Sequence, residues 1–295
     1  MMLPITYPDG PIFEDIHDKY LVSAQSENFY SALKENIFED PYLIPGTEGQ
    51  VNSEKWLQIR PFLFTASEAK KICGLSTENG KKHFLQQHLW GIKKFKGNAA
   101  TRYGTRMEKT ARLAYTRAIL KKDPLVTVEE TGLWVKEEFP YLGCSLDGLV
   151  KKNGTIIRIV ELKCPYVLRH VHPKNFSNHL SKTQLENFPL KQHSNGKITM
   201  KKDHAYYFQV QMQMDVMKVI VSDFFLWSKK GFLRIEVDYN PSFWVAKRNM
   251  MEMKHRGLLI PEYFLMRTPR NLKPWDLNDL EESEVEDSEN VDGDL

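Results

Sequence analysis

Three ionisable side chains, Asp147, Glu161 and Lys163, occur in a pattern that could do chemistry. Asp147 is followed by Gly, and Glu161 and Lys163 end a run rich in Ile and Val that begins at Thr155. Because side chains alternate along a strand with a period of two, Glu161 and Lys163 would share one face and Leu162 would point to the other. Two carboxylates can hold a hard divalent cation such as Mg²⁺, which prefers oxygen ligands. With a lysine that orients water and balances phosphate charge, the pattern indicates metal-assisted phosphodiester cleavage.

The same residues also fit an ordinary structural role. An Asp-Gly pair commonly marks a turn, and Glu-x-Lys on a strand is commonly a solvated ion pair. The neighbouring motifs must therefore decide between a catalytic site and a turn with a surface pair.

Two side chains on expected helices could complete the site. Glu108 lies on an expected helix over residues 98–120 and could add a third carboxylate. Gln209 lies on an expected helix over residues 205–220 and could orient the lysine or a phosphate. On spacing alone, both also fit solvated positions on a helix surface.

A second group of residues has the composition of a phosphate pocket. Arg60 offers a guanidinium, and Ser67 offers a hydroxyl at an expected helix N-terminus, where anions are favoured. Ser145, two residues before Asp147, could add another donor. An exposed arginine, an ordinary helix cap and the end of a strand are the alternatives for these three residues.

The elements that must position these side chains follow from hydrophobic periodicity and from cap and turn signals. Helices are expected over residues 28–38, 53–60, 66–73, 81–90, 98–120, 205–220 and 241–256. Strands are expected over residues 126–135, 143–150, 155–164, 197–200, 223–227 and 232–239, and residues 167–189 look irregular. This order predicts an α/β or α+β fold with a central mixed sheet flanked by helices.

Charge is distributed unevenly along the 295 residues. The net charge is +3, but residues 276–295 carry ten acids and no Lys or Arg, so residues 1–275 have a net charge of +13. A basic body predicts a polyanionic partner, and the run Lys-Lys-Phe-Lys at 93–96 suits contacts with a DNA backbone. The tail has few apolar residues, so we expect it to be disordered and to aid solubility rather than to compete with DNA.

Composition also limits where in the cell the protein is expected to be. No apolar run reaches the roughly 18 residues of a transmembrane helix, and residues 1–18 lack the basic and apolar regions of a signal peptide. Three widely spaced cysteines suit a reducing environment. We therefore expect an intracellular protein, nuclear or cytoplasmic, that is neither secreted nor bound to a membrane.

The order of five motifs resembles that of the YqaJ viral recombinase family, a branch of the PD-(D/E)xK nucleases that includes phage lambda exonuclease. The motifs are WLxxR followed by TAS (56–67), GTRMEKTA (104–111), GCSLDGL (143–149), ELKCP (161–165) and YYFQVQ (206–211). The resemblance implies a restriction-endonuclease-like core and makes residues 51–275 the nuclease domain, between an N-terminal arm (1–50) and the acidic tail. The long insertion between Pro165 and Tyr206 resembles the animal versions of the family.

The resemblance also implies a role for each candidate in the centre of the site. Asp147 and Glu161 would bind the metal, with the Leu162 backbone carbonyl as a further ligand. Lys163 would position or deprotonate the attacking water. The expected cofactor is Mg²⁺, for which Mn²⁺ could substitute.

The surrounding candidates receive roles in the same way. Glu108 would be the helix carboxylate near the metal, and Gln209 would support the lysine and the water. Arg60, Ser67 and Ser145 resemble the pocket that holds a 5′-phosphate at a duplex end.

Two departures from the family pattern leave all of these residues in place. The family often has Pro before the catalytic Asp, where this chain has Leu146. The spacing from Asp147 to Glu161 is longer than in the phage enzyme, which suggests a longer hairpin.

The implied activity is a Mg²⁺-dependent exonuclease that degrades double-stranded DNA 5′→3′ and leaves 3′ single-stranded overhangs for recombination. The implied partners are double-stranded DNA, a single-strand annealing protein and further copies of the chain, since phage relatives form trimers. A structure-specific endonuclease on the same fold and a catalytically inactive DNA-binding adaptor are the alternatives.

Overall fold

The computed structural model describes residues 19–35, 40–92 and 97–275, with side chains from residue 27 onward. The basic run at 93–96 and the acidic tail at 276–295, for which DNA contacts and a solubility role are expected, lie outside the described residues. None of the described helices is long and apolar enough to cross a membrane.

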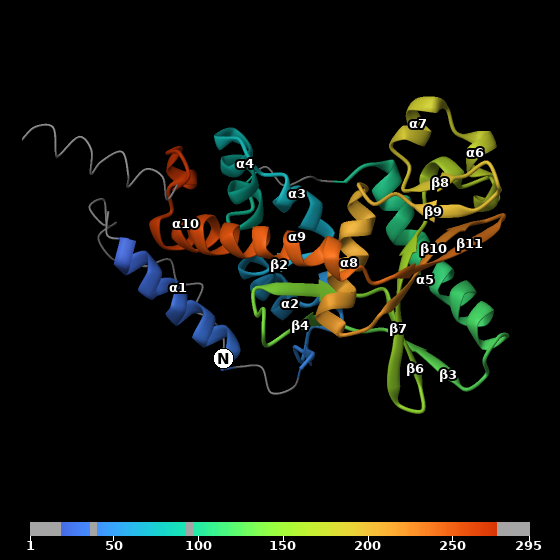
Figure 1. The fold of residues 1–295 in the computed structure, drawn as a ribbon, viewed down its shortest axis with the longest axis horizontal. Coiled ribbons are helices and arrows are strands. Elements are labelled where there is room, and N and C mark those ends of the chain that lie inside the picture. The colour runs from blue at the N-terminus through green and yellow to red at the C-terminus, as the bar shows by residue number, and fades with distance from the viewer. Residues whose placement is uncertain (1–18, 36–39, 93–96, 276–295) are drawn as a thin grey trace, which may run out of the picture.

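A five-stranded mixed sheet carries the predicted catalytic strand at its centre (Figure 1). Its strands, in spatial order, are β11 (Gly231–Asp238), β10 (Val221–Ser228), β7 (Thr155–Lys163), β6 (Gly148–Lys152) and β3 (Val126–Glu129). β7 is parallel to β10 and antiparallel to β6, and β10 and β11, which cover the strands expected over 223–227 and 232–239, pair as an antiparallel hairpin. Ile159 and Val160 of β7 pair with both neighbouring strands, whereas Glu161, Leu162 and Lys163 at its end pair with β10 alone.

A four-stranded sheet corrects two of the strand predictions. It contains, in order, β1 (Tyr42–Leu43), β4 (Leu133–Val135), β5 (Leu142–Ser145) and β2 (Phe64–Thr65). The strands expected over 126–135 and 143–150 are therefore each broken, with their first and second halves in different sheets. The Gln50 side chain fixes both breaks, because its Nε2 donates to the carbonyls of Thr131 and Leu146 at 3.0 Å each.

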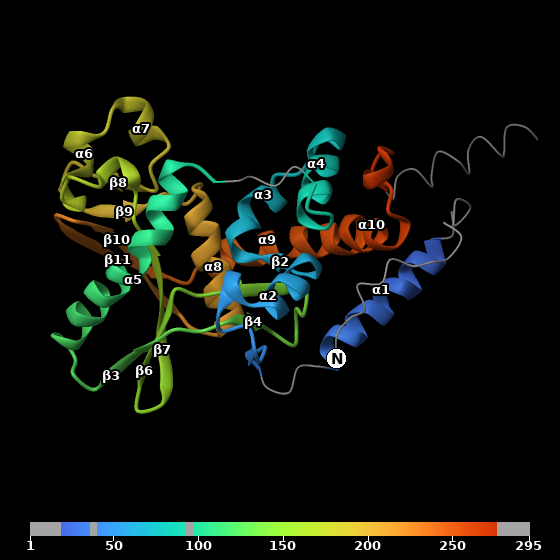
Figure 2. The same cartoon turned by 180° about the vertical axis from the view of Figure 1, so that it is seen from behind.

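Two helices cover opposite faces of the five-stranded sheet, as Figures 1 and 2 show from opposite sides. On one face, α5 (Ala99–Leu120) buries Tyr115 and Ile119 against Val160 and Leu162 of β7. A capping box of Asn98 and Thr101 starts this helix where the sequence predicts it. The other face is covered by α8 (Ala205–Met217).

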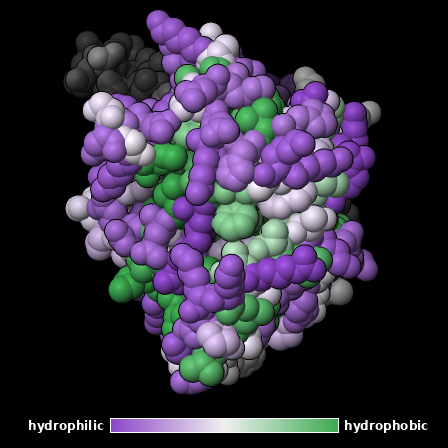
Figure 3. All heavy atoms as spheres, turned by 90° about the vertical axis from the view of Figure 1, so that its right-hand side faces the viewer, coloured by the Kyte–Doolittle hydropathy of each residue, from purple (hydrophilic) through white to green (hydrophobic). Residues whose placement is uncertain are grey.

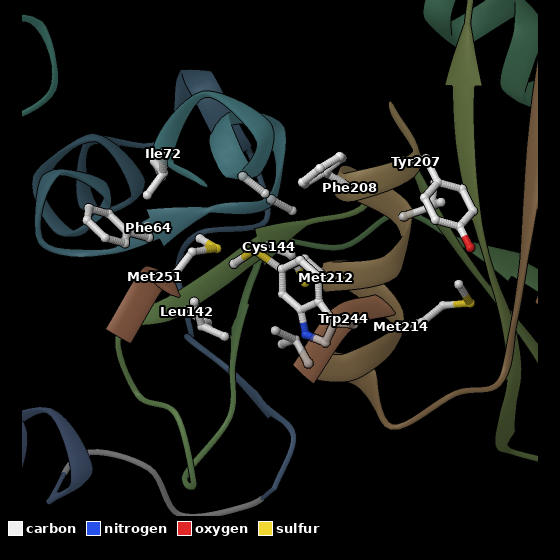
Figure 4. Close-up of a cluster of buried hydrophobic side chains, with 14 of the residues drawn as sticks. Phe64, Ile72, Leu142, Cys144, Tyr207, Phe208, Met212, Met214, Trp244 and Met251 are labelled. Carbon is white, nitrogen blue, oxygen red and sulfur yellow. The ribbon is translucent and has the colours of Figure 1, made fainter. Parts of the chain in front are cut away.

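Helix α8 is more deeply buried than its sequence suggests. A single apolar stripe through Tyr207, Val210, Met214 and Met217 is expected, but every residue from Tyr207 to Met217 is buried. The reason is that α8 lies between the sheet and the helices α3 (Ala69–Cys73) and α9 (Pro241–Lys254). Figure 4 shows Tyr207, Phe208, Met212 and Met214 of this helix in the buried cluster that also contains Phe64, Trp244 and Met251.

The remaining helices surround these layers. They are α1 (Lys19–Lys34), α2 (Glu54–Ile59), α4 (Glu78–His88), α6 (Phe176–His179), α7 (Lys182–Glu186) and α10 (Ile260–Leu265). Ser53 caps α2 at the start of the helix expected over 53–60, whereas α1 ends earlier than the helix expected over 28–38. The segment expected to be irregular contains α6 and α7, and β8 (Leu190–Gln192) pairs with β9 (Ile198–Met200) after it.

The predicted fold class is confirmed as a mixed α/β architecture with mixed sheets flanked by helices. Residues before 51 contribute to the same core, since Phe29 and Tyr30 are buried and β1 pairs with β4. The division of the chain at residue 50 stays a prediction.

Candidate active site

Glu161 and Lys163 share one face of β7, as the alternation predicts. Both side chains lie on the side of α8, and the Lys163 ammonium donates to Glu161 Oε1. The same ammonium lies 4.9 Å from the centre of the Tyr206 ring, at the start of α8. Leu162 points the other way, into the cluster beneath α5. The pair is therefore built into the sheet–helix interface and is not a solvated surface pair.

Two glutamines of α8 hold the Glu161 carboxylate, which is 1% exposed. Gln209 Nε2 donates to Oε1 and Gln213 Nε2 donates to Oε2, each at 2.7 Å. The structure thus brings Gln209 to the site as expected, whereas sequence reasoning missed Gln213. The four-residue spacing of these glutamines, which places them on one helix face, was the available signal.

Asp147 occupies the break between β5 and β6, where the chain passes from one sheet to the other. Its Oδ2 accepts a hydrogen bond of 2.7 Å from the Leu162 backbone amide. This bond fixes Asp147 beside the strand that carries Glu161 and Lys163. The structure therefore brings the two predicted carboxylates and the lysine together, although they lie on different strands.

Electrostatics at this point favour an added cation. Burial and the neighbouring Glu161 charge raise the pKa of Asp147 to about 8, against the lowering influence of Lys163. Burial alone would lower the pKa of Lys163, but Glu161 and Asp147 outweigh it and the pKa rises. The raised pKa means that Asp147 and Glu161 ionise together only at a cost, and a divalent cation bound between them would offset that cost.

Glu108 is one of the charges that raise the pKa of Asp147, and its role as a third carboxylate stays a prediction. Its Oε1 accepts a 2.7 Å hydrogen bond from Arg112, one turn along α5. Arg112 also pairs with Glu130 and donates from Nε to the Asp147 carbonyl at 2.9 Å. Arg112, which sequence reasoning missed, therefore links the helix to the strand break. Across the described residues, no group of three or more His, Cys, Asp or Glu side chains is arranged to hold a metal ion.

The donor chemistry of Asp147 and Glu161 nevertheless fits a hard cation. Both groups offer only oxygen atoms, as Mg²⁺ prefers. A carboxylate has about four lone-pair positions, and hydrogen bonds occupy three of those on Glu161. One position on Oε2 is left to receive a cation that Asp147 would share. The Leu162 carbonyl stays a predicted further ligand.

The three predicted phosphate-pocket residues lie in one connected group. Trp56 Nε1 donates to Ser145 Oγ at 2.8 Å, and the Arg60 guanidinium stacks 4.9 Å from the centre of the Trp56 ring. The link continues through Thr65, whose hydroxyl lies 3.5 Å from Arg60 Nη2 and 3.4 Å from Ser67 Oγ.

Trp56 and Thr65 complete this group, and sequence reasoning gave neither of them a role. Ser145 ends β5, two residues before Asp147, so the group adjoins the carboxylates. A guanidinium and hydroxyls in this position have the composition of an anion site.

Glu68 adds a negative charge to the rim of this group. It accepts a 3.1 Å hydrogen bond from Thr65 and lies 3.1 Å from His88 Nδ1. Burial would raise the pKa of Glu68, but His88, Arg60 and Thr65 lower it to about 2. Glu68 therefore stays ionised. Its Oε2 lies 3.8 Å from Arg60 Nη2 and partly neutralises the guanidinium charge.

Comparisons with known proteins give one family match. The profile of the YqaJ-like viral recombinase domain matches residues 55–219. Among curated proteins, none matches the sequence significantly.

Several solved structures are similar at low identity. An alkaline exonuclease from Laribacter hongkongensis is 18% identical with a TM-score of 0.49, over 81% of this chain and 100% of that chain. A phage-related exonuclease from Haemophilus somnus 129PT is 14% identical with a TM-score of 0.44, over 70% and 96%. The shutoff and exonuclease protein of Kaposi's sarcoma-associated herpesvirus is 13% identical with a TM-score of 0.42, over 80% and 74%.

Proposed function

The chain belongs to the family of YqaJ-like viral recombinase domains, and on that premise we propose that it is a Mg²⁺-dependent exonuclease of double-stranded DNA. Membership of the family supports a nuclease. We further propose that degradation runs 5′→3′ and leaves 3′ single-stranded overhangs for recombination. The observation that carries the proposal is the convergence of Asp147, Glu161 and Lys163 at the end of the central strand.

Each residue of the candidate site has its own role in this proposal. Asp147 and Glu161 would hold Mg²⁺, or Mn²⁺ in its place, and the cation would polarise the scissile phosphate and acidify water. Lys163, fixed by Glu161 and by the Tyr206 ring, orients the attacking water and balances phosphate charge. Gln209 and Gln213 keep Glu161 from rotating.

The phosphate-pocket residues support the proposed direction. A terminal 5′-phosphate bound by Arg60, Ser67 and Ser145 would place the adjacent phosphodiester near Asp147, two residues from Ser145. Double-stranded DNA with a 5′-phosphate is therefore the proposed substrate. A homo-oligomer and a single-strand annealing partner belong to the same proposal, on the family resemblance.

The test compares linear duplex DNA with covalently closed circular duplex, each in Mg²⁺ and in EDTA. The proposal predicts Mg²⁺-dependent loss of the linear substrate alone, and no loss with Lys163→Ala. Lys151→Ala is the matched control, since Lys151 is a strand lysine that pairs with Glu129 on an exposed surface.

Each alternative has its own outcome in this experiment. Cutting of the closed circle would replace the exonuclease with a structure-specific endonuclease. Folded protein that binds DNA but cleaves neither substrate would leave the catalytically inactive adaptor.

A further inference from the structure

Residues 166–204 form an insertion whose two ends meet at the candidate active site. It begins at Tyr166, three residues after Lys163, with a single helical turn over Tyr166–Leu168. It ends at His204, which caps α8 two residues before Tyr206, whose ring lies beside the Lys163 ammonium. A DNA strand held at Lys163 would therefore pass next to the insertion.

The insertion is a packed unit, so its surface side chains have fixed positions. Several of its apolar residues are buried in the main core, namely Leu168, Phe176, Leu180, Phe188, Leu190 and Met200. The Phe176 and Phe188 rings stack at 4.9 Å, and Ser228 of β10 donates to the Val171 carbonyl at 2.7 Å. Lys201 stabilises the insertion from within, because its ammonium donates to the carbonyls of Leu185 and Glu186.

The outer surface of the insertion carries unpaired positive charge. Residues 166–204 contain seven Lys and Arg against two acids. Five of the lysines are exposed, and their ammonium groups make no hydrogen bond or ion pair with any described residue. These are Lys174, Lys182, Lys191, Lys197 and Lys202. Figure 3 shows this side of the molecule, and hydrophilic side chains cover most of its upper part, where the insertion lies.

An exposed aromatic ring stands at the root of the insertion. Tyr166 is 36% exposed, and the Arg169 guanidinium lies 3.9 Å from its ring centre. Arg169 Nη1 donates to the Tyr166 carbonyl at 3.0 Å, and the Tyr103 ring of α5 packs edge-on at 5.6 Å. An aromatic ring with an adjacent guanidinium is a surface on which an unpaired base can stack.

We propose that the insertion is a DNA-binding unit that holds the strand engaged in the active site. The exposed lysines contact its phosphates, and the Tyr166–Arg169 pair stacks on one of its bases. The proposal rests on the proposed function for the identity of the ligand, but DNA binding can be measured without cleavage.

The first experiment measures how the affinity for DNA depends on salt, in EDTA so that no cleavage occurs. Each phosphate contact contributes about 0.9 to the slope of log affinity against log salt for duplex DNA. The triple variant Lys182→Gln, Lys191→Gln, Lys197→Gln is expected to lower that slope by about 2 to 3. The matched control removes three exposed lysines outside the insertion, Lys34, Lys121 and Lys122, and is expected to lower it by less than about 1.

The second experiment tests the stacking pair with single-stranded DNA, also in EDTA. Tyr166→Ala is expected to weaken binding about tenfold, and Tyr166→Phe, which keeps the ring, is expected to bind like the parent. Thermal unfolding of each variant would show that the fold is retained.

The outcomes separate this proposal from the proposed function. Equal slopes for the triple variant and its control would overturn the lysine contacts, and equal binding by Tyr166→Ala and Tyr166→Phe would overturn the stacking. Parent protein that cleaves normally would leave the nuclease intact in either case. A lowered slope in a protein without Mg²⁺-dependent cleavage would keep the DNA-binding unit and reject the nuclease.

Discussion

The Glu161 carboxylate accepts hydrogen bonds from three side chains while it is almost completely buried. A buried carboxylate that loses a donor is left partly unsatisfied, which costs about 1–3 kcal/mol or more. The donors also fix its orientation, because rotation about the final torsion would break all three bonds at once. The proposed metal site therefore also needs Gln209 and Gln213, which hold Glu161 in one orientation.

Removal of the Gln213 amide should affect both stability and metal use. Gln213→Leu is expected to lower the free energy of unfolding by about 1–3 kcal/mol. It should also raise the Mg²⁺ concentration needed for half-maximal cleavage, because Glu161 can rotate. Denaturant unfolding and a Mg²⁺ titration of the cleavage rate would measure the two effects.

A neighbouring glutamine provides the control. Gln211 is buried on the same helix, but it bonds the backbone of Asp238 and Asn240 at the end of β11. Gln211→Leu should lose similar stability and keep the parental Mg²⁺ requirement. If both variants needed more Mg²⁺ to the same extent, the proposed role of Gln213 in orienting Glu161 would be contradicted.

At the residue scale, the sequence predicted side-chain positions correctly where the repeat of a single strand determines them. The period of a strand places Glu161 and Lys163 together, and the structure confirms it. Arg112 and Trp56 were missed because their partners, the Asp147 carbonyl and Ser145, are distant in sequence. A spacing rule along one element cannot give the rotation of a helix relative to a strand from another part of the chain.

At the scale of elements, Asp147 owes its position to a strand that changes sheets. The local pattern over residues 143–150 is that of one continuous strand, so sequence reasoning could not find the break. The cause is tertiary, since the Gln50 side chain satisfies the carbonyls freed at both crossings, at Thr131 and at Leu146. Backbone groups without a ladder partner need such a donor when they are buried.

Shortening of the Gln50 side chain should loosen both crossings. Gln50 has a positive φ of 47°, which Asn also tolerates. Gln50→Asn keeps the backbone preference but cannot reach the two carbonyls, so we expect a loss of about 1–3 kcal/mol in unfolding free energy. The cleavage rate should fall with it, because Asp147 follows Leu146. If Gln50→Asn unfolded in denaturant with the parental free energy, the proposed role of Gln50 at the two crossings would be contradicted.

A second element-scale feature is the buried His255, which joins three parts of the chain. It lies in a π-helical segment, His255–Leu259, between α9 and α10. Its Nδ1 accepts from the Tyr30 hydroxyl of α1, and its Nε2 donates to the Phe62 carbonyl, each at 2.9 Å. Burial lowers the pKa of His255 from 6.5 to about 3. The imidazole is therefore neutral in the folded protein.

This pKa gives the sign of a pH dependence. Between about pH 6.5 and pH 3 the unfolded chain binds a proton that the folded chain does not, so stability falls as the pH is lowered through this window. The limiting slope is about 1.4 kcal/mol per pH unit. His255→Gln should lose this contribution, whereas His83→Gln, at an exposed histidine, should keep the parental slope. Denaturant unfolding between pH 4 and pH 7 would measure it, and identical slopes would contradict the burial argument.

At the scale of the whole molecule, charge separates the body from the tail. Residues 1–275 have a net charge of +13, and residues 276–295 contribute ten acids. A basic body raises the local concentration of DNA at low ionic strength. The fold class and the family were both predictable from the sequence at this scale, because the motifs keep their order along the chain.

Deletion of residues 276–295 should change solubility more than binding. The truncated protein is expected to bind duplex DNA within about twofold of the parent at 0.15 M salt, where charges beyond about 8 Å are screened. Its solubility should fall, because added acidic residues favour solubility. A large gain in affinity on truncation would instead show that the tail competes with DNA.

The most direct measurement follows the two ends of a linear duplex. One substrate carries a label at the 5′ end and another at the 3′ end, and the 5′ end has either a phosphate or a hydroxyl. Cleavage is compared in Mg²⁺ and in EDTA, with the parent and with Lys163→Ala. We expect Mg²⁺-dependent release that starts at the phosphorylated 5′ end and is absent in the variant. Release from the 3′ end would contradict the direction, and cleavage by Lys163→Ala at the parental rate would contradict the site.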